Sequence, residues 1–337
     1  MKRFLVFVLF ALCLNLYGQP EIVKDADGVS HVGGLAPLSE DFHIKAKERG
    51  LYAEKSDLLF DEELPKTYTP IGSLLGKIPN YSQGNYGTCY SFAGAYTIFL
   101  SEAVNLSKLN HGYDLAKDIV DNYTKDFMFA PNVGITACTQ WSNGGWYFDM
   151  FDNWVEKGGA YLRDVPYSGS GYRTCNFLKP DIRGVEYKII EEPTVATIKR
   201  AVMKYGAVAT AVASSCLSKS DKVGACRTTS YNHAVTIIGW TETHWIIQNS
   251  WDENTDNVFW YLNLSSSPYN NTYVVVKDHT DNIVPTPSPD PDPKPDPDPQ
   301  PDPQPTPDPI SVKDIITYIA VGLFAFLLVG FIIIRKK

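Results

Sequence analysis

The chain has 337 residues, six cysteines and a formal net charge of −8 at pH 7. A proline-rich segment from Pro285 to Pro309 carries −5 of that charge, with six aspartates against one lysine, so the rest of the chain is nearly neutral. A nearly neutral body argues against nucleic acid as a partner. The roughly 215 residues between Leu64 and Asp278 are enough for one domain with a sizeable core.

Residues 1–18 are predicted to be a secretory signal peptide. Met1-Lys2-Arg3 is positively charged, and an apolar run follows from Phe4 to about Leu16. A membrane anchor is the alternative, but the run is short for a bilayer span. We therefore expect a secretory signal peptide with cleavage near Gly18.

The segment from Gln83 to Phe92 passes from a polar turn into a helical apolar pattern. Its apolar positions recur at intervals of three and four residues, at Phe92, Ala95, Tyr96, Phe99 and Ala103. This spacing predicts a core-facing helix with Cys89 in its first turn. Unpaired N–H groups and the helix dipole at that end stabilise a thiolate and lower the pKa of a thiol. Cys89 is therefore the candidate nucleophile.

His233 and Asn249 lie in two strand-like segments further along the chain. An imidazole can take the proton of an attacking thiol and deliver it to the leaving amine near neutral pH. The amide oxygen of Asn249 can hold that ring by accepting its other N–H. The Gln83 side chain and the Cys89 N–H could bind the developing oxyanion, a contribution of roughly 3–4 kcal/mol in comparable sites.

These segments, in this order, resemble the papain-like cysteine peptidases. The matching stretches are Gln83 to Tyr90, Asn232-His233-Ala234 and Asn249-Ser250-Trp251. His233 lies 144 residues after Cys89 and Asn249 lies 160 after it, against about 130–150 for both in that family; a longer loop would explain the later Asn. The resemblance implies that Cys89 is the nucleophile, His233 the base and acid, Asn249 the orienting residue and Gln83 an oxyanion donor.

The resemblance also implies an α+β fold in which a helical lobe and an antiparallel β-barrel lobe enclose a cleft. The residue patterns agree with two unlike halves. Helices are expected near 41–54, 89–103, 115–127, 146–154 and 194–205. Strands are expected at 207–212, 234–240, 245–249, 258–264 and 272–276, where β-branched and aromatic residues dominate.

Substrate-binding residues follow from the same resemblance. The candidates are Gly144, Gly145, Ala211, Asn232, Ala234 and Trp251. Glycine lets the backbone approach a peptide closely, although Gly144-Gly145 could also be a plain turn before a helix. Ala211, Ala234 and Trp251 would line the subsite for the residue two before the cut, with room for a bulky apolar side chain. No inserted loop or extra His pair blocks one end, which favours an endopeptidase.

Removal of Cys13 with the signal peptide leaves five cysteines. An odd number suits one reactive thiol and two disulfides in an oxidising compartment. The resemblance implies a Cys138–Cys175 bridge, leaving Cys216–Cys226 to close a local loop. It also places a further bridge beside the nucleophile in relatives, where this chain has Tyr86 and Ser142; its absence puts local rigidity in doubt.

Residues 19–63 stand where the family carries an inhibitory propeptide, and Leu64-Pro65 resembles a common mature start. The peptidase domain is then expected at 64–281. The alternative is that 19–63 form an N-terminal arm packed on the domain.

The C-terminal part predicts a stalk and a membrane anchor. Proline alternates with polar residues within 282–311, which favours a stiff polyproline II stalk. Residues 315–334 are uncharged and long enough to span a bilayer, and the basic tail 335–337 places the domain outside the cell or in an endosomal or lysosomal lumen. A removable lipid-anchor signal is the alternative.

Five glycosylation sequons occur, at Asn80, Asn105, Asn122, Asn263 and Asn270.

The combined interpretation is a membrane-anchored cysteine endopeptidase acting on protein or peptide substrates. Thiol, imidazole and amide groups suffice for this chemistry, so no metal and no cofactor are expected. An acyltransferase or transpeptidase could use the same thioester. A non-catalytic adhesion or peptide-binding ectodomain is the third possibility, because a fold does not fix a function. The sequence does not indicate an oligomeric state.

Overall fold

The structure is a computed structural model. It describes residues 21–36, 41–54, 58, 63–70, 80–109, 131, 144–168, 176–180, 186–191, 193–228, 230–252, 259–266 and 273–277. The contacts divide the chain into two units, Met1–Val284 and Pro285–Lys337. The second unit, with most of the expected stalk and the expected membrane span, lies outside the described residues, as do the signal peptide, Cys138 and Cys175. None of the helices in the described part has the length and hydropathy needed to cross a membrane.

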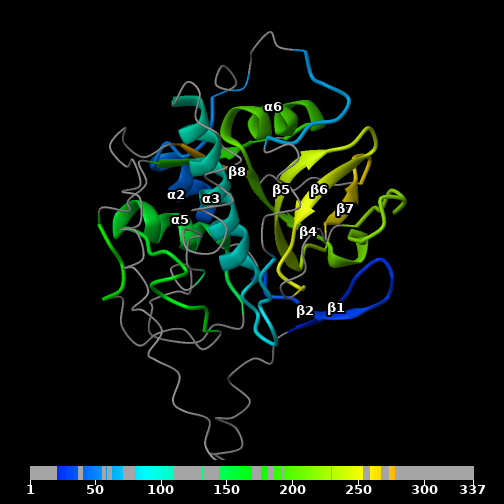
Figure 1. Ribbon diagram of the computed structural model, residues 1–337, viewed down its shortest axis with the longest axis horizontal. Coiled ribbons are helices and arrows are strands. Elements are labelled where there is room, and N and C mark those ends of the chain that lie inside the picture. The colour runs from blue at the N-terminus through cyan, green and yellow to red at the C-terminus, as the bar shows by residue number, and fades with distance from the viewer. Residues whose placement is uncertain are drawn as a thin grey trace, which may run out of the picture. The chain divides into compact units, whose positions relative to one another are not determined.

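The described helices and strands form two groups (Figure 1). The helices are α2 (Phe42–Glu48), α3 (Cys89–Leu109), α5 (Tyr147–Glu156), α6 (Val195–Tyr205) and the short 3-10 helix η6 (Ser214–Cys216). The strands are β1 (Ile22–Lys24), β2 (Ser30–Val32), β3 (Glu186–Ile190), β4 (Val208–Val212), β5 (His233–Trp240), β6 (His244–Gln248), β7 (Trp260–Asn263) and β8 (Tyr273–Lys277). In Figure 1, α3 runs between α5 on one side and the large sheet on the other.

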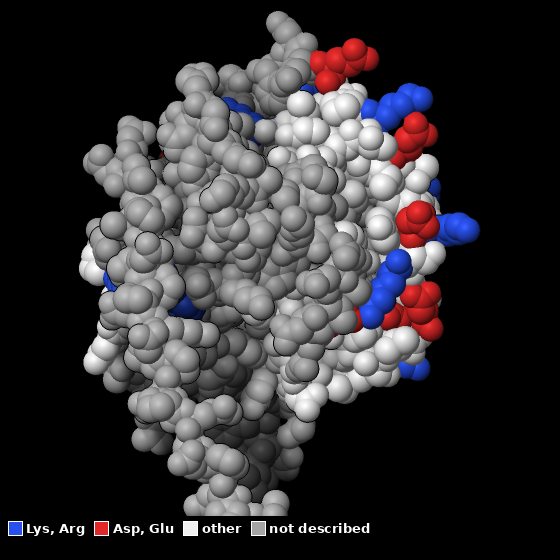
Figure 2. Space-filling model, in the orientation of Figure 1, with Lys and Arg blue, Asp and Glu red and all other residues white. Residues whose placement is uncertain are grey.

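Charged side chains of both signs lie next to one another on the described surface in Figure 2. Among the described residues, Lys219 and Asp252 form an ion pair, and Lys66 and Glu242 form another, at 3.4 Å. Exposed pairs of this kind contribute about 0–1 kcal/mol each. The mixture agrees with the nearly neutral composition of this part of the chain.

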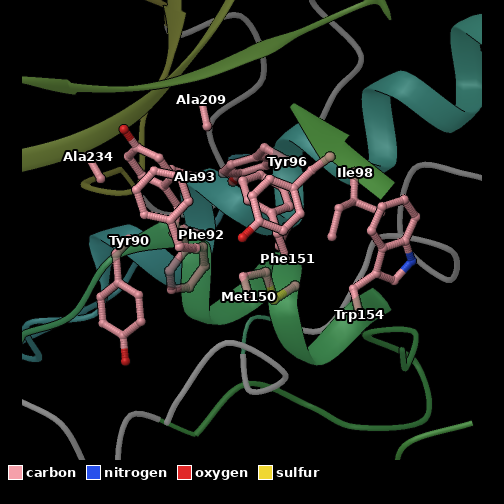
Figure 3. Packing of buried hydrophobic residues seen from close by; sticks show 14 of the residues in the cluster. Tyr90, Phe92, Ala93, Tyr96, Ile98, Met150, Phe151, Trp154, Ala209 and Ala234 are labelled. Atoms are coloured by element: carbon pink, nitrogen blue, oxygen red, sulfur yellow. The ribbon is translucent and has the colours of Figure 1, made fainter. Parts of the chain in front are cut away.

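The helical lobe is built on α3, whose residues from Cys89 to Leu100, including its single glycine Gly94, are all buried. Helix α5 buries an aromatic face against it that includes Tyr147. Figure 3 shows Phe151 and Trp154 of this face. The helices cross closely at Gly94, because a Cβ there would lie 2.6 Å from the Met150 side chain. Burial of each large side chain contributes about 1.5–3 kcal/mol, so this packing fixes the start of α3 firmly in the core.

The β lobe is a six-stranded antiparallel sheet in the order β3-β8-β4-β5-β6-β7. Helix α6 packs on β4, β5 and β8, and a second hydrophobic cluster fills the space between them. Thr194 begins α6 by accepting a hydrogen bond from Thr197 N at 3.1 Å. Gly206 ends it with φ +90°, a conformation that favours glycine. This architecture confirms the expected α+β, two-lobe class.

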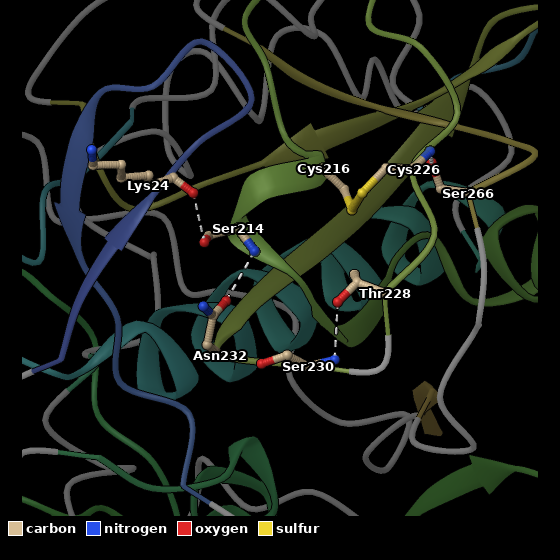
Figure 4. The surroundings of a disulfide bond; sticks show 8 residues. All are labelled: Lys24, Ser214, Cys216, Cys226, Thr228, Ser230, Asn232 and Ser266. Atoms are coloured by element: carbon tan, nitrogen blue, oxygen red, sulfur yellow. Dashed lines mark hydrogen bonds between the residues drawn. A yellow bond between two sulfur atoms is a disulfide. The ribbon is translucent and has the colours of Figure 1, made fainter.

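The N-terminal residues form a hairpin of β1 and β2 that packs beside η6 (Figure 4). In its turn, Asp25 Oδ1 accepts hydrogen bonds from the N–H groups of Asp27 and Val29, at 2.9 and 2.8 Å. Ser214 Oγ donates to Lys24 O at 2.8 Å. The expected Cys216–Cys226 disulfide is present and joins the last residue of η6 to Cys226. The hairpin therefore packs on η6, which the disulfide ties to the segment around Cys226 in the β lobe.

Most expected elements are confirmed within one or two residues, including α5, α6 and strands β4 to β8. Helix α2 is shorter than the 41–54 segment, and the helix expected at 115–127 lies outside the described residues. Strand β3 and the hairpin were not expected. The dipeptide Asp27-Gly28, with Gly28 at φ +82°, is a turn signal that could have indicated the hairpin.

Candidate active site

Cys89 is the first residue of α3 and is fully buried. The carbonyl oxygen of Thr88 accepts hydrogen bonds from Ser91 N and Phe92 N, at 3.0 and 3.3 Å, which starts the helix at this point. Of the cysteines in the described ranges, Cys89 is the one with a free thiol. The expected position of the thiol at a helix N-terminus is confirmed.

His233 begins β5, and Asn249 directly follows β6 on the neighbouring strand. The His233 Nε2 and Asn249 Oδ1 atoms are 2.7 Å apart. Because an amide oxygen only accepts, Nε2 carries the proton and Nδ1 is left as an acceptor. Nδ1 is buried and has no hydrogen-bond partner among the described residues. The indole of Trp251 stacks on the imidazole with ring centroids 4.0 Å apart, so the ring is held on one edge and one face.

Ser250 links Gln83 to Asn249. Its hydroxyl donates to Gln83 Oε1 at 2.7 Å, and its N–H donates to Asn249 Oδ1 at 2.8 Å. Its carbonyl oxygen accepts from Gln83 N at 2.8 Å. The contact to Oε1 orients the Gln83 amide so that its Nε2 donates to Tyr86 O and Val32 O, at 2.7 and 3.0 Å. The sequence analysis did not assign Ser250, although it lies inside the Asn249-Ser250-Trp251 segment.

The protonation of the site differs from the expectation of a lowered thiol pKa. Burial raises the pKa of Cys89 to about 12, and hydrogen bonds from the backbone at Ala234 and Tyr90 oppose this. Burial lowers the pKa of His233 to about 3, against the opposing bond to Asn249. Desolvation disfavours both charged forms, so the described state holds a neutral thiol and a neutral imidazole.

Gly145 is buried and rests on the ring of Tyr90. A Cβ at Gly145 would lie 2.6 Å from Tyr90 Cζ, so glycine is required here. The Gly145 N–H donates to Gly34 O at 2.9 Å, and Gly145 O accepts from Ala36 N at 3.2 Å. Gly145, next to Gly144, thus pairs with an extended peptide, as expected for a substrate-binding residue, but that peptide belongs to the same chain.

Ala211 and Ala234 face each other across β4 and β5 and are buried. They share a hydrophobic cluster with Leu35, the residue that pairs with Gly145. Asn232 O accepts from Gly34 N at 3.4 Å, and its side-chain oxygen accepts from Ser214 N at 2.9 Å. The expected substrate-binding residues are therefore brought together around residues 34–36.

We call residues 21–36 the arm; it comprises the hairpin and the extended segment after it. Val32 O accepts from Gln83 Nε2 at 3.0 Å and from Trp251 Nε1 at 3.1 Å. His31 stacks on Trp251 with centroids 4.1 Å apart and planes within 5°. At Gly34, a Cβ would lie 2.3 Å from the Gly87 carbonyl carbon. The arm therefore covers the site at van der Waals contact.

The arm is not arranged to be cut. The Val32 carbonyl lies on the Gln83 donor, but the next nitrogen, Gly33 N, donates its proton to Glu21 O at 2.8 Å inside the hairpin. Cleavage requires the leaving nitrogen to receive a proton from the base, and Nδ1 of His233 has no partner among the described groups. The arm occupies the donor without presenting its amide nitrogen for protonation.

No metal-binding group of three or more His, Cys, Asp or Glu residues occurs within the described ranges. The groups that the site does offer are a thiol, an imidazole with one bare nitrogen, and amide donors. Together they can perform nucleophilic acyl chemistry.

Comparison with known proteins gives a family and a fold. No curated protein sequence matches the chain significantly. Two solved structures resemble it at 15% identity: xylellain, a cysteine protease from Xylella fastidiosa (TM-score 0.50, covering 77% of this chain and 98% of that one), and procathepsin B S9 from Trypanosoma congolense (TM-score 0.51, covering 81% and 98%). A third is the proform of the ragweed pollen cysteine protease Amb a 11 (TM-score 0.50, 15% identity, covering 72% and 74%). The family model described as papain family cysteine protease matches residues 78–271, more than half of the chain. The chain therefore belongs to the papain family of cysteine proteases.

Proposed function

We propose that this protein is a cysteine endopeptidase that is held latent by its own arm. The main supporting observation is the hydrogen bond between His233 Nε2 and Asn249 Oδ1. It leaves Nδ1 of the ring, which has no hydrogen-bond partner among the described residues, as a proton acceptor in the site that contains Cys89. Family membership and fold support peptidase chemistry, and two of the similar structures are proforms by their titles.

In the proposed reaction, the Cys89 thiol gives its proton to His233 Nδ1 and the sulfur attacks the substrate carbonyl carbon. The carbonyl oxygen becomes an oxyanion held by Gln83 Nε2 and the Cys89 N–H. His233 then protonates the leaving amine as the C–N bond breaks, which gives a thioester. Water, deprotonated by His233, cleaves the thioester and releases the acid product and the free thiol. Asn249 keeps Nδ1 directed at the reacting atoms throughout.

We also propose that the domain is carried on the proline-rich stalk by a C-terminal membrane helix, with the domain outside the cell or in a lumen. This rests on residues 282–337 of the sequence alone. Detergent dependence of the full-length chain, compared with a chain ending at residue 283, tests it.

The arm has to leave before substrate can bind. Val32 O accepts a hydrogen bond from Gln83 Nε2, and Gly34 packs against the Gly87 backbone, so both groups are covered. Gly34→Val is therefore an arm-release variant: its Cβ cannot fit against the Gly87 backbone. Gly224→Val is its matched control, since a Cβ at Gly224 meets nothing within 4 Å.

The test is labelling of residues 19–283 with a peptidyl epoxide, which alkylates activated thiols, followed by mass mapping and a fluorogenic peptide assay. We expect one adduct on Cys89, faster in Gly34→Val than in Gly224→Val, and absent in Cys89→Ala and His233→Ala. Turnover of the peptide should follow the labelling. No adduct in Gly34→Val would overturn the proposal and favour a peptide-binding module.

A further inference from the structure

Tyr167 makes two hydrogen bonds to a segment far from it in sequence. Its phenol donates to Gln83 O at 3.1 Å and lies 2.6 Å from Thr88 Oγ1. Gln83 carries the side-chain oxyanion donor, and Thr88 directly precedes Cys89, which carries the backbone donor. One phenol oxygen therefore connects the two ends of the 83–88 turn.

The protons on these bonds can be assigned. The single phenol proton is used on the Gln83 carbonyl, so the Thr88 hydroxyl must donate to the phenol oxygen. Thr88 is completely buried. Burial also raises the pKa of Tyr167 to about 12, so the phenol keeps its proton over the neutral range. The phenol proton is therefore present for the bond to Gln83 O near neutral pH.

The ring of Tyr167 is fixed as well. It packs edge-on against Phe92, with centroids 4.8 Å apart and planes at 67°. Phe92 is buried in the first turn of α3. The position of the phenol oxygen is therefore fixed relative to α3, the helix that begins with Cys89.

The turn that Tyr167 spans needs such a support. It contains Gly84, at φ +61°, and Gly87, both of which are conformationally permissive. The one disulfide in the described part of the chain, Cys216–Cys226, lies elsewhere. Oxyanion donors act only when they are within about 2.7–3.1 Å of the developing charge, so the separation between the two donors matters.

We propose that Tyr167 is a positioning residue that sets the separation between the Gln83 and Cys89 oxyanion donors. This inference rests on the proposed function. Tyr167 does not touch substrate; it acts through the backbone of Gln83 and the side chain of Thr88. Loss of its hydroxyl reduces the stabilisation of the transition state by the oxyanion donors. Substrate binding and thiol activation stay unchanged.

The test is Tyr167→Phe in the Gly34→Val background, with Tyr261→Phe as the matched tyrosine control. We expect kcat and the affinity for a peptide aldehyde, which forms an oxyanion on the enzyme, to fall together by about tenfold. KM and the rate of reaction with 2,2′-dipyridyl disulfide, which needs no oxyanion donor, should stay within about twofold. Tyr261→Phe should change none of these.

Three results overturn the inference. The first is an unchanged kcat. The second is a parallel loss of thiol reactivity, which would indicate general damage to the site. The third is an inactive and unlabelled Gly34→Val parent, which removes the proposed function itself and is thereby distinguished from failure of Tyr167 alone. If Tyr167→Phe does not fold, Thr88→Val removes the other half of the support, and the same readouts decide.

Discussion

The main-chain carbonyl of Val32 lies 3.0 Å from Gln83 Nε2, although the two residues are 51 positions apart. The donor proposed for the oxyanion is therefore already bound to a peptide carbonyl of the same chain. Gln83 Nε2 also donates to Tyr86 O at 2.7 Å, so both of its protons are used. In the described structure, a peptide carbonyl of the arm therefore occupies a side-chain donor of the candidate active site.

His31→Ala should open the site. His31 Nε2 lies 2.9 Å from Asp25 Oδ2, and its ring stacks on Trp251. An aromatic pair of this kind contributes about 0.5–1.5 kcal/mol, so we expect epoxide labelling of Cys89 to become about tenfold faster. His43→Ala, on the exposed side of α2, is the matched control and should have no effect. Equal labelling rates in the two variants would contradict a holding role for His31.

Acid should release the arm. Burial holds the pKa of His233 at about 3 in the covered state, whereas an exposed imidazole titrates near 6.5. Below about pH 6.5, His233 therefore binds a proton in the uncovered state but stays neutral in the covered state. The equilibrium then shifts towards uncovering by up to about tenfold per pH unit, until the pH nears 3. The same sign means that the covered fold loses stability over this window as pH falls.

The measurement is the ratio of Cys89 labelling rates in the parent and in Gly34→Val between pH 7 and pH 5. The variant lacks a docked arm, so the ratio cancels the intrinsic pH dependence of the thiol. We expect the ratio to rise towards one as the pH falls. A ratio independent of pH would exclude coupling between His233 and the arm. Because Asp25 and His31 face the same site, the experiment is repeated in Asp25→Asn.

Asn249→Ala should separate ring orientation from thiol chemistry. It removes the acceptor for His233 Nε2 and leaves a buried N–H without a partner. Loss of that bond costs about 1–3 kcal/mol, so we expect kcat in the arm-release background to fall by about 10- to 100-fold. Asn249→Asp keeps an acceptor oxygen and is the comparison; it should retain more activity. Similar kcat values for the Ala variant and its parent would show that Trp251 alone orients the ring.

The sequence predicted the elements that have strong local patterns. The helix at Cys89 and strand β5 were predicted because their apolar residues follow a clear period or run. Strand β3 was missed although Glu186 to Ile189 alternate between polar and apolar residues. The strand is only five residues long, and its partner, β8, lies more than 80 residues later. Local periodicity carries no information about such a pairing.

The residues of the candidate site were predicted from the sequence, but their protonation and the covering of the site by the arm were not. The motifs indicated Cys89, His233, Asn249 and Gln83, and the structure places the last three in one hydrogen-bonded group with Ser250. The thiol pKa was expected to be low because of the helix N-terminus. Burial is a tertiary property and outweighs that local effect here. The contact of Val32 with Gln83 has no sequence signature either, because it uses a main-chain carbonyl.

Two truncations should separate the arm from the folded body. Helix α2 and the residues after it belong to the core: Ala46 and Leu51 are buried, and Arg49 pairs with Asp152 at 2.7 Å. The backbone of Ile189 donates to Leu51 O at 2.7 Å, which adds this segment to the edge of β3. Of the described residues, a chain that begins at Asp41 loses the arm alone, whereas one that begins at Leu64 also loses these contacts.

We expect the chain from Asp41 to fold and to label rapidly at Cys89. The chain from Leu64, the expected mature start, should unfold about 5–10 °C lower, because exposure of the surfaces under Ala46 and Leu51 costs a few kcal/mol. Thermal unfolding of both chains, with epoxide labelling, is the measurement. If they unfold at the same temperature, residues 41–63 add nothing to the core and the whole of 19–63 behaves as a removable propeptide. If the chain from Leu64 alone is destabilised, activation needs displacement of the arm, and residues 41–54 remain part of the working enzyme.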